Sequence, residues 1–197
     1  MYDEEINDIG NFGIYDNKYI FDTEIAGIST KTFSFKDHIE SRKLALIINL
    51  CFNGYTFNGI KKYILSNDLK RSDWIKYIYN NLDKFNISIR RIFDSFISET
   101  KSELWESEEE ITNYYSNKKN YDKLVKGESG GNLVYKYMAW IFSERSKFLI
   151  NDIFNLTKEF IKSSGKMDAS VDTEINELKK YIICIASDSF EFGNILE

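Results

Sequence analysis

Hydrophobic positions divide the chain into a short β-forming start and a long helical remainder. Residues 1–33 contain β-forming side chains on both sides of Asp16-Asn17, a pair that is typical of a turn. This pattern predicts two or three short strands, of which one hairpin is the simplest arrangement. Because a two-stranded hairpin is marginal in water, we expect it to pack on the helices or on another protein.

From residue 34 onward the hydrophobic spacing is helical. Segment 38–52 is nearly apolar on all sides after Lys43, which is typical of a central, buried helix. The further segments with helical spacing are 56–65, 73–82, 87–105, 121–126, 133–163 and 172–186. The sequence therefore predicts a mainly α fold, a multi-helix bundle with a small N-terminal β-hairpin or short strands.

Polar residues mark the expected helix starts. Ser34 with Asp37, and Ser107 with Glu110, have the spacing of a capping box, in which each side chain bonds the backbone N–H of the other residue. Ser72 is expected to cap the helix that follows it. We expect each helix that begins at one of these residues to bury one apolar face.

Three regions follow from these patterns. Residues 1–33 are the β-rich N-terminal segment, residues 34–187 the helical domain, and residues 188–197 a frayed tail. Strands are expected only within about the first 30 residues.

Composition excludes several classes of protein. A formal net charge of −5 over 197 residues provides no basic surface for nucleic acid. No apolar run approaches the roughly 20 residues of a membrane span, and no apolar signal core follows the acidic start, so we expect neither a membrane nor a secreted protein. Cys51 and Cys184 have no CxxC partner, so we expect two buried, reduced thiols in the cytoplasm.

No catalytic or metal-ligating set can be assembled from the sequence. His38 is the only histidine and lies beside Asp37 and Glu40, where a local hydrogen bond or solvent exposure competes with a role in proton transfer. The acidic residues Glu108 to Glu110 suit the first turn of a helix better than acid–base chemistry, because the helix dipole favours negative charge there. We expect no catalytic residue and no metal ligand, and hence no enzyme activity of this chain on its own.

A glycine-rich segment before the longest predicted helix is the candidate for substrate binding. Glu128, Gly130, Gly131 and Asn132 precede the helix 133–163, where free backbone N–H groups can bind an anion. Lys136 lies one turn further along on the same helix face as Asn132, within reach of a phosphate or carboxylate. These five residues are the predicted substrate-binding residues.

The same segment has a purely structural interpretation. Gly127 can end the preceding short helix, Gly130-Gly131 can allow a tight reversal, and Asn132 can cap the long helix. Neither the GxxxxGK[ST] nor the GxGxxG pattern is present, which disfavours a nucleotide as the ligand.

Three stretches, taken together, resemble one protein family. They are Thr32-Phe33-Ser34-Phe35-Lys36-Asp37-His38, then Glu103-Leu104-Trp105-Glu106-Ser107-Glu108-Glu109-Glu110-Ile111, and last the segment 121–137 with Gly127-Glu128 and Gly130-Gly131-Asn132-Leu133. The combination is similar to the C-terminal helical region of radical S-adenosylmethionine (SAM) proteins that carry a cobalamin (B12)-binding domain. The resemblance covers about residues 20–165 and implies a mostly helical region.

The resemblance also carries an expectation about cofactors. In that family a CxxxCxxC motif holds a 4Fe-4S cluster, and S-adenosylmethionine and cobalamin bind to other domains. This chain has neither that motif nor the radical SAM core nor the cobalamin domain, so we expect it to bind none of these cofactors.

The function implied by the resemblance is that of a non-catalytic accessory or C-terminal domain of a cobalamin-dependent radical SAM enzyme. Such a domain would cover the active-site mouth or contribute to substrate selection, together with a radical SAM/cobalamin partner or its parent chain. The alternative is a stand-alone helical module that binds other proteins.

Overall fold

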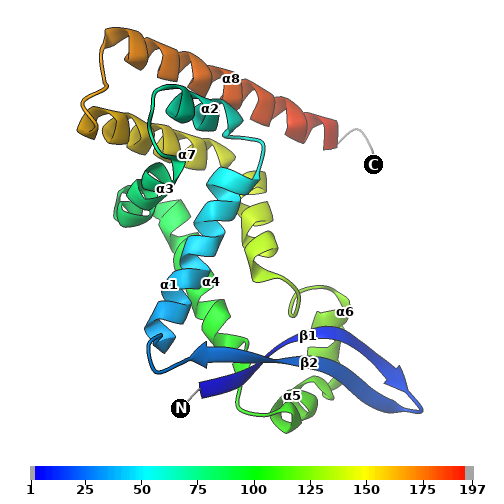
Figure 1. Cartoon of the computed structure of the whole chain (residues 1–197). Coiled ribbons are helices and arrows are strands. Elements are labelled where there is room, and N and C mark those ends of the chain that lie inside the picture. The colour runs from blue at the N-terminus through cyan, green and yellow to red at the C-terminus, as the bar shows by residue number, and fades with distance from the viewer. Residues whose placement is uncertain (1–2, 194–197) are drawn as a thin grey trace. The chain divides into compact units, whose positions relative to one another are not determined.

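A computed structural model describes the backbone of residues 3–193 and the side chains of residues 11–186. It confirms a mainly α fold with an antiparallel hairpin at the N-terminus (Figure 1). In chain order the elements are β1 (Asp3–Tyr15), β2 (Lys18–Ser29), α1 (Phe35–Ile48), the π-helix η1 (Asn49–Asn53), α2 (Asn58–Ser66), α3 (Arg71–Asn80), the 3₁₀-helix η2 (Leu82–Lys84), α4 (Ile87–Ser102), β3 (Leu104–Trp105), α5 (Glu108–Tyr115), α6 (Lys118–Val125), α7 (Leu133–Ser163) and α8 (Ala169–Gly193).

The residues group into two compact units by their backbone contacts. Unit 1 consists of Met1–Lys43 and Ser95–Tyr135, and unit 2 of Leu44–Asp94 and Lys136–Glu197. The division therefore passes within α1, α4 and α7. It differs from the predicted division into residues 1–33 and 34–187, because the hairpin belongs to the same unit as α5 and α6.

The hairpin forms at the predicted turn. Asp16 and Asn17 have φ values of 47° and 60°, as a two-residue turn of the I′ type requires. Short polar side chains tolerate this left-handed region better than other non-glycine residues do. From this turn β1 and β2 pair antiparallel as far as Asp3 and Ser29.

A third strand joins the hairpin from far along the chain. In the sheet order β2-β1-β3, the short strand β3 pairs with Ile6 and Asn7 of β1. The prediction that strands are confined to about the first 30 residues is therefore wrong, and so is the helix end predicted at residue 105, because α4 ends at Ser102. Helical spacing along a segment cannot reveal that two residues after it will pair with a distant strand.

Aromatic packing attaches the hairpin to the helices of unit 1. Phe12, Tyr19 and Phe21 surround the ring of Tyr121 on α6, with ring centroids 4.9 to 6.3 Å apart. The hairpin therefore packs on helices, as a two-stranded ribbon needs. Phe21 and Trp105 also pack against a buried cluster from α5 and α6, which consists of Ile111, Tyr115 and Leu124.

The Ser34–Asp37 capping box is complete, whereas the Ser107–Glu110 box has only one of its two predicted bonds. The Ser34 Oγ accepts a hydrogen bond from the Asp37 N–H at 3.2 Å, and the Asp37 carboxylate accepts one from the Ser34 N–H at 2.8 Å. The Ser107 Oγ accepts from the Glu110 N–H at 3.2 Å, whereas the Glu110 carboxylate accepts from the N–H of Glu106, one residue before the predicted donor, also at 3.2 Å.

Other predicted helix ends differ from the structure. Ser72 does not cap α3, because the helix begins at Arg71 after the extended Lys70 and already includes Ser72. The last helix continues to Gly193, beyond the predicted end at residue 186. The predicted frayed tail 188–197 therefore begins as helix, and residues 194–197 lie outside the described residues.

Side chains of α7 hold the elements of unit 2 that pack on it. The Asp152 carboxylate accepts a hydrogen bond from the Asn86 N–H at 2.8 Å, at the start of α4. Burial raises the pKa of Asp152. One turn and a half further along, the Lys158 ammonium lies 2.7 Å from the Asp172 carboxylate of α8. A single long helix thus positions the chain segments before and after it.

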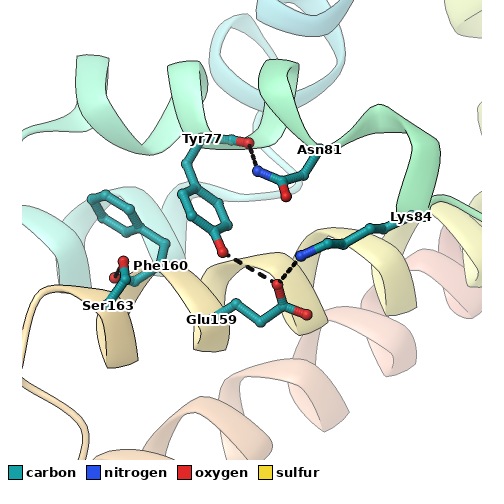
Figure 2. Close-up of polar contacts among 6 residues, drawn as sticks. All are labelled: Tyr77, Asn81, Lys84, Glu159, Phe160 and Ser163. Atoms are coloured by element: carbon teal, nitrogen blue, oxygen red, sulfur yellow. Dashed lines mark hydrogen bonds and ion pairs between the residues drawn. The ribbon is translucent and has the colours of Figure 1, made fainter.

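Glu159 on α7 connects α3 and η2 to this helix (Figure 2). Its carboxylate accepts from the Tyr77 hydroxyl at 3.2 Å and from the Lys84 ammonium at 2.6 Å. The hydrogen bond from Lys84 lowers the pKa of Glu159, and the same bond raises the pKa of Lys84. Since both paired side chains are 45% exposed, the pair orients these elements more than it stabilises them.

A buried hydrogen bond joins side chains of α3 and α7 in the core of unit 2. The Trp74 indole N–H donates to the Thr157 Oγ at 2.9 Å, and the Thr157 hydroxyl donates to the Ile153 carbonyl at 2.6 Å. Trp74 and Thr157 are both 0% exposed. Because water cannot reach this buried indole N–H, the Thr157 hydroxyl serves as its hydrogen-bond acceptor.

We expect Thr157→Val to lower the free energy of unfolding by about 1–3 kcal/mol, because it leaves the buried Trp74 N–H without an acceptor. Thr100→Val is the matched control. Thr100 is also buried, but its hydroxyl donates only to the Phe96 carbonyl of its own helix, at 2.8 Å, so the loss should be much smaller. Urea unfolding followed by circular dichroism measures both, and equal losses would contradict the role of the cross-helix bond.

Candidate functional site

The glycine-rich segment 127–132 first ends α6. Gly127 has a φ of 68°, its N–H donates to the Leu124 carbonyl at 3.0 Å, and the Glu128 N–H donates to the Lys123 carbonyl at 2.8 Å. This pair of bonds is the Schellman motif of a helix C-terminus. The predicted role of Gly127 is confirmed, and the Glu128 N–H serves the helix end.

The same segment then begins α7. The Asn132 Oδ1 accepts from the Val134 N–H at 3.0 Å and from the Tyr135 N–H at 3.4 Å, which confirms the predicted cap. Gly130 and Gly131 have φ values of 74° and 85°, a region that glycine adopts without strain. N–H groups that would otherwise face an anion are therefore bonded to the cap.

The predicted substrate-binding residues fall into both units. Glu128, Gly130, Gly131 and Asn132 belong to unit 1, whereas Lys136 is the first residue of the second stretch of unit 2. The Lys136 ammonium lies 5.9 Å from the centroid of the Tyr137 ring. Four of the five residues thus lie in one loop. The end of α6 and the start of α7 account for the backbone conformation of that loop.

An apolar groove in unit 2 was not predicted from the sequence. It has a volume of about 600 Å³ and runs between α3 and the helical segment made of α1 and η1; we name it the α1–α3 groove. Its lining residues are Leu44, Ile48, Phe52, Arg71, Ser72, Ile75, Lys76, Tyr79 and Asn80. The contribution of α1 and η1 is entirely apolar, with residues four apart on one helix face.

Segment 38–52 is therefore not the fully buried helix that its sequence predicts. Leu46 and Ile47 are buried, at 0% and 1% exposure, whereas Leu44, Ile48 and Phe52 are only half-buried. A signal for the groove was present in the sequence. A helix that is apolar around its whole circumference has more apolar surface than one neighbouring core can cover.

A π-helix carries the last residue on this side of the groove. The Lys61 ammonium of α2 donates to the Phe52 and Gly54 carbonyls at 2.5 and 2.9 Å and lies 5.4 Å from the Phe52 ring centroid. Burial lowers the pKa of Lys61. Since the last carbonyls of a helix need partners, Lys61 stabilises the end of η1 and so positions Phe52. Single π-turns occur often at functional sites.

The charged side chains that line the groove are both cations. Arg71 is held by a hydrogen bond from its Nε to the Lys61 carbonyl, at 3.1 Å. Lys76, on the same helix, is exposed. No acidic residue is among those that line the groove. The α1–α3 groove therefore has an apolar floor and a positively charged rim on the α3 side.

The residues with reactive side chains are not among those that line the groove or those predicted to bind the substrate. Cys51 is buried, and burial raises the pKa of its thiol, but Cys184 is exposed, so the prediction of two buried thiols is wrong for Cys184. The cause is that α8 presents this position to solvent. His38 stacks on Phe35 with ring centroids 6.1 Å apart, and burial followed by the charge of Arg42 lowers the pKa of the imidazole.

Two further features concern the part of the chain that the structure describes. No group of three or more His, Cys, Asp or Glu side chains there lies close enough together to hold a metal ion. No helix there has both the length and the apolar content that crossing a membrane requires.

We expect Asn132→Ala to lower the free energy of unfolding by about 1 kcal/mol, the usual effect of a lost N-cap.

Gly131→Ala should lower the free energy of unfolding by about 1–2 kcal/mol through its backbone conformation alone, because φ is +85° and nothing lies within 4 Å of the added Cβ. Lys136→Ala should leave the melting temperature nearly unchanged. Thermal unfolding and calorimetric titration with phosphate measure these effects. Loss of phosphate binding in Lys136→Ala would favour the ligand interpretation of the loop.

Comparison of the chain with protein-family models, with curated proteins and with solved structures finds no match. The resemblance to cobalamin-dependent radical SAM proteins therefore depends on the three sequence stretches that carry it. The geometry of the loop and of the α1–α3 groove supplies the remaining arguments about function.

Proposed function

We propose that this chain is a non-catalytic helical domain that acts by binding a protein. The α1–α3 groove is the observation that carries this proposal, because its apolar side chains remain half-buried in the folded chain. Apolar surface gathered in one place on a folded domain is typical of a binding surface. A groove between two helices is moreover a common docking site for a segment of another protein.

We further propose that the bound protein is a cobalamin-dependent radical SAM enzyme, or the parent chain of which this domain is the C-terminal part. The support is the resemblance of the three sequence stretches. In such an assembly the chain would cover the active-site mouth or contribute to substrate selection. Glu128, Gly130, Gly131, Asn132 and Lys136 are the residues proposed to face the substrate.

The chain's own side chains favour binding over chemistry. The thiol of Cys51 is buried and its pKa is raised, so it is a poor nucleophile. The imidazole of His38 stacks on Phe35, and burial followed by the charge of Arg42 lowers its pKa. Within the described part of the chain, neither side chain makes a hydrogen bond to the second group that an activated nucleophile needs.

A stand-alone interaction module is the second candidate. The hairpin of unit 1 favours it, because large apolar side chains remain exposed there: Ile14 56%, Tyr15 71%, Ile20 53% and Ile25 69%. In a module with two binding surfaces, the hairpin and the α1–α3 groove, each surface can bind a different protein. These proteins need not be parts of one enzyme. The two candidates differ in the kind of protein that each would retain.

A capture experiment separates these functions. We expect the tagged chain, expressed in its own cells, to retain a protein that contains a CxxxCxxC motif and a cobalamin domain, as identified by mass spectrometry. Ile48→Ser in the groove should reduce the yield, because a hydroxyl replaces part of the apolar contact surface. Lys119→Glu changes an exposed residue of α6 and is the control, which should leave the yield unchanged. Retention only of proteins without that motif would support the interaction module, and retention of none would contradict both.

We also expect the anaerobically reconstituted chain to bind neither an iron–sulfur cluster nor cobalamin. Its two cysteines are fewer than the three thiolates that a radical SAM cluster requires. Visible absorption and iron analysis of the purified chain measure this. Iron in stoichiometric amount, retained after desalting, would contradict the prediction.

A further inference from the structure

We propose that the α1–α3 groove receives an amphipathic helix whose apolar side chains enter the groove and whose flanking side chains are acidic. This inference rests on the proposed binding function and names the chemistry of the partner. It is carried by the dimensions of the groove, by the distribution of charge along its rim and by the way its rim and one end are held.

The dimensions suit a short helix. Leu44, Ile48 and Phe52 line one side, and six residues between Arg71 and Asn80 line the other. At a rise of 1.5 Å per residue each side extends over about 12 Å, or roughly two helical turns. A partner helix presents apolar residues at positions i, i+3, i+4 and i+7 over the same length.

The exposure of the groove favours a helix over a small molecule. Sites for small molecules usually enclose most of the ligand surface. Here Ile48 and Phe52 are half-buried, and Lys76 is exposed at the rim. A ligand in this groove therefore keeps one side in solvent, as the polar face of an amphipathic helix does.

The charge along the rim specifies the partner's flanks. Both ionisable residues that line the groove, Arg71 and Lys76, are cationic and lie on α3. They lie five positions apart, about one and a half turns of α3, so acidic residues at a similar spacing on a docked helix can face them. Opposite charges at the edge of an interface accelerate association and select among partners. A basic helix with the same apolar residues would meet like charges instead.

The rim at Arg71 and the end of the groove at Phe52 are held in place before any partner binds. Arg71 is fixed through its bond to the Lys61 carbonyl, and Lys61 in turn holds the Phe52 and Gly54 carbonyls. Because these side chains are already ordered, binding loses less conformational entropy.

Fluorescence anisotropy with synthetic helical peptides tests the proposal on the whole chain. Peptide one carries leucines at i, i+3, i+4 and i+7 with glutamates on both flanks. Peptide two has lysines in place of the glutamates, and peptide three has serines in place of the leucines. We expect saturable binding of peptide one, weakened by salt, and much weaker binding of the other two.

Charge reversal on the protein supplies the matched variants. Lys76→Glu should weaken binding of peptide one about fivefold, as expected for one exposed ion pair and one repulsion, and should strengthen binding of peptide two. Lys119→Glu makes the same change of charge on α6 and should alter neither. Ile48→Ala should weaken peptide one without changing its salt dependence. Circular dichroism checks that each variant is folded.

The results separate this inference from the proposed function. If peptide two binds better than peptide one, or if Lys76→Glu and Lys119→Glu act alike, the acidic helix is wrong. Capture of a radical SAM protein through the groove would then leave the proposed function intact. If peptide one binds as expected and no such protein is captured, the inference stands and the assignment of the enzyme fails. Self-association of the chain that peptide one does not displace would also overturn the inference.

Discussion

The rotation of α3 about its own axis depends on one buried hydrogen bond. The Trp74 indole must face α7, because Thr157 is where its N–H finds an acceptor at 2.9 Å. Successive helix residues differ by about 100° around the axis, so Ile75 and Tyr79 share a direction that differs from that of Trp74. That direction is the α1–α3 groove. The same helix thus closes the core of unit 2 with one face and builds the candidate binding surface with the next.

The groove also depends on a surplus of apolar surface in α1. Leu46 and Ile47 fill the core, and Leu44, Ile48 and Phe52 are left half-buried on another side. Apolar surface gathered in one place on a folded domain is typical of a binding surface, which is the basis of the proposed function. Lys61 contributes by bonding the carbonyls of η1, so the groove keeps a defined end at Phe52. In the proposed binding function, the positive rim selects among apolar partners.

The glycine-rich loop shows how one set of backbone groups can support two interpretations. Anion binding and helix capping both use the free N–H groups at a helix N-terminus. Here the Asn132 side chain accepts from two of them, and the Gly127 and Glu128 N–H groups bond the end of α6. The capping residues also belong to the stretches that resemble the radical SAM family. The resemblance therefore has to be tested by the partner that the chain binds.

The sequence by itself determined what local interactions control: the helical segments, the Asp16-Asn17 turn, the Ser34–Asp37 capping box, the Ser107 cap and the full extent of α7. Each of these depends on residues within about one or two turns of one another, so spacing reveals them. Only the tertiary structure decided that β3 pairs with β1, that Cys184 is exposed, and that one apolar side of α1 meets α3 across a groove. These outcomes depend on which distant segment covers each face, and the periodicity of a single segment carries no information about its neighbour.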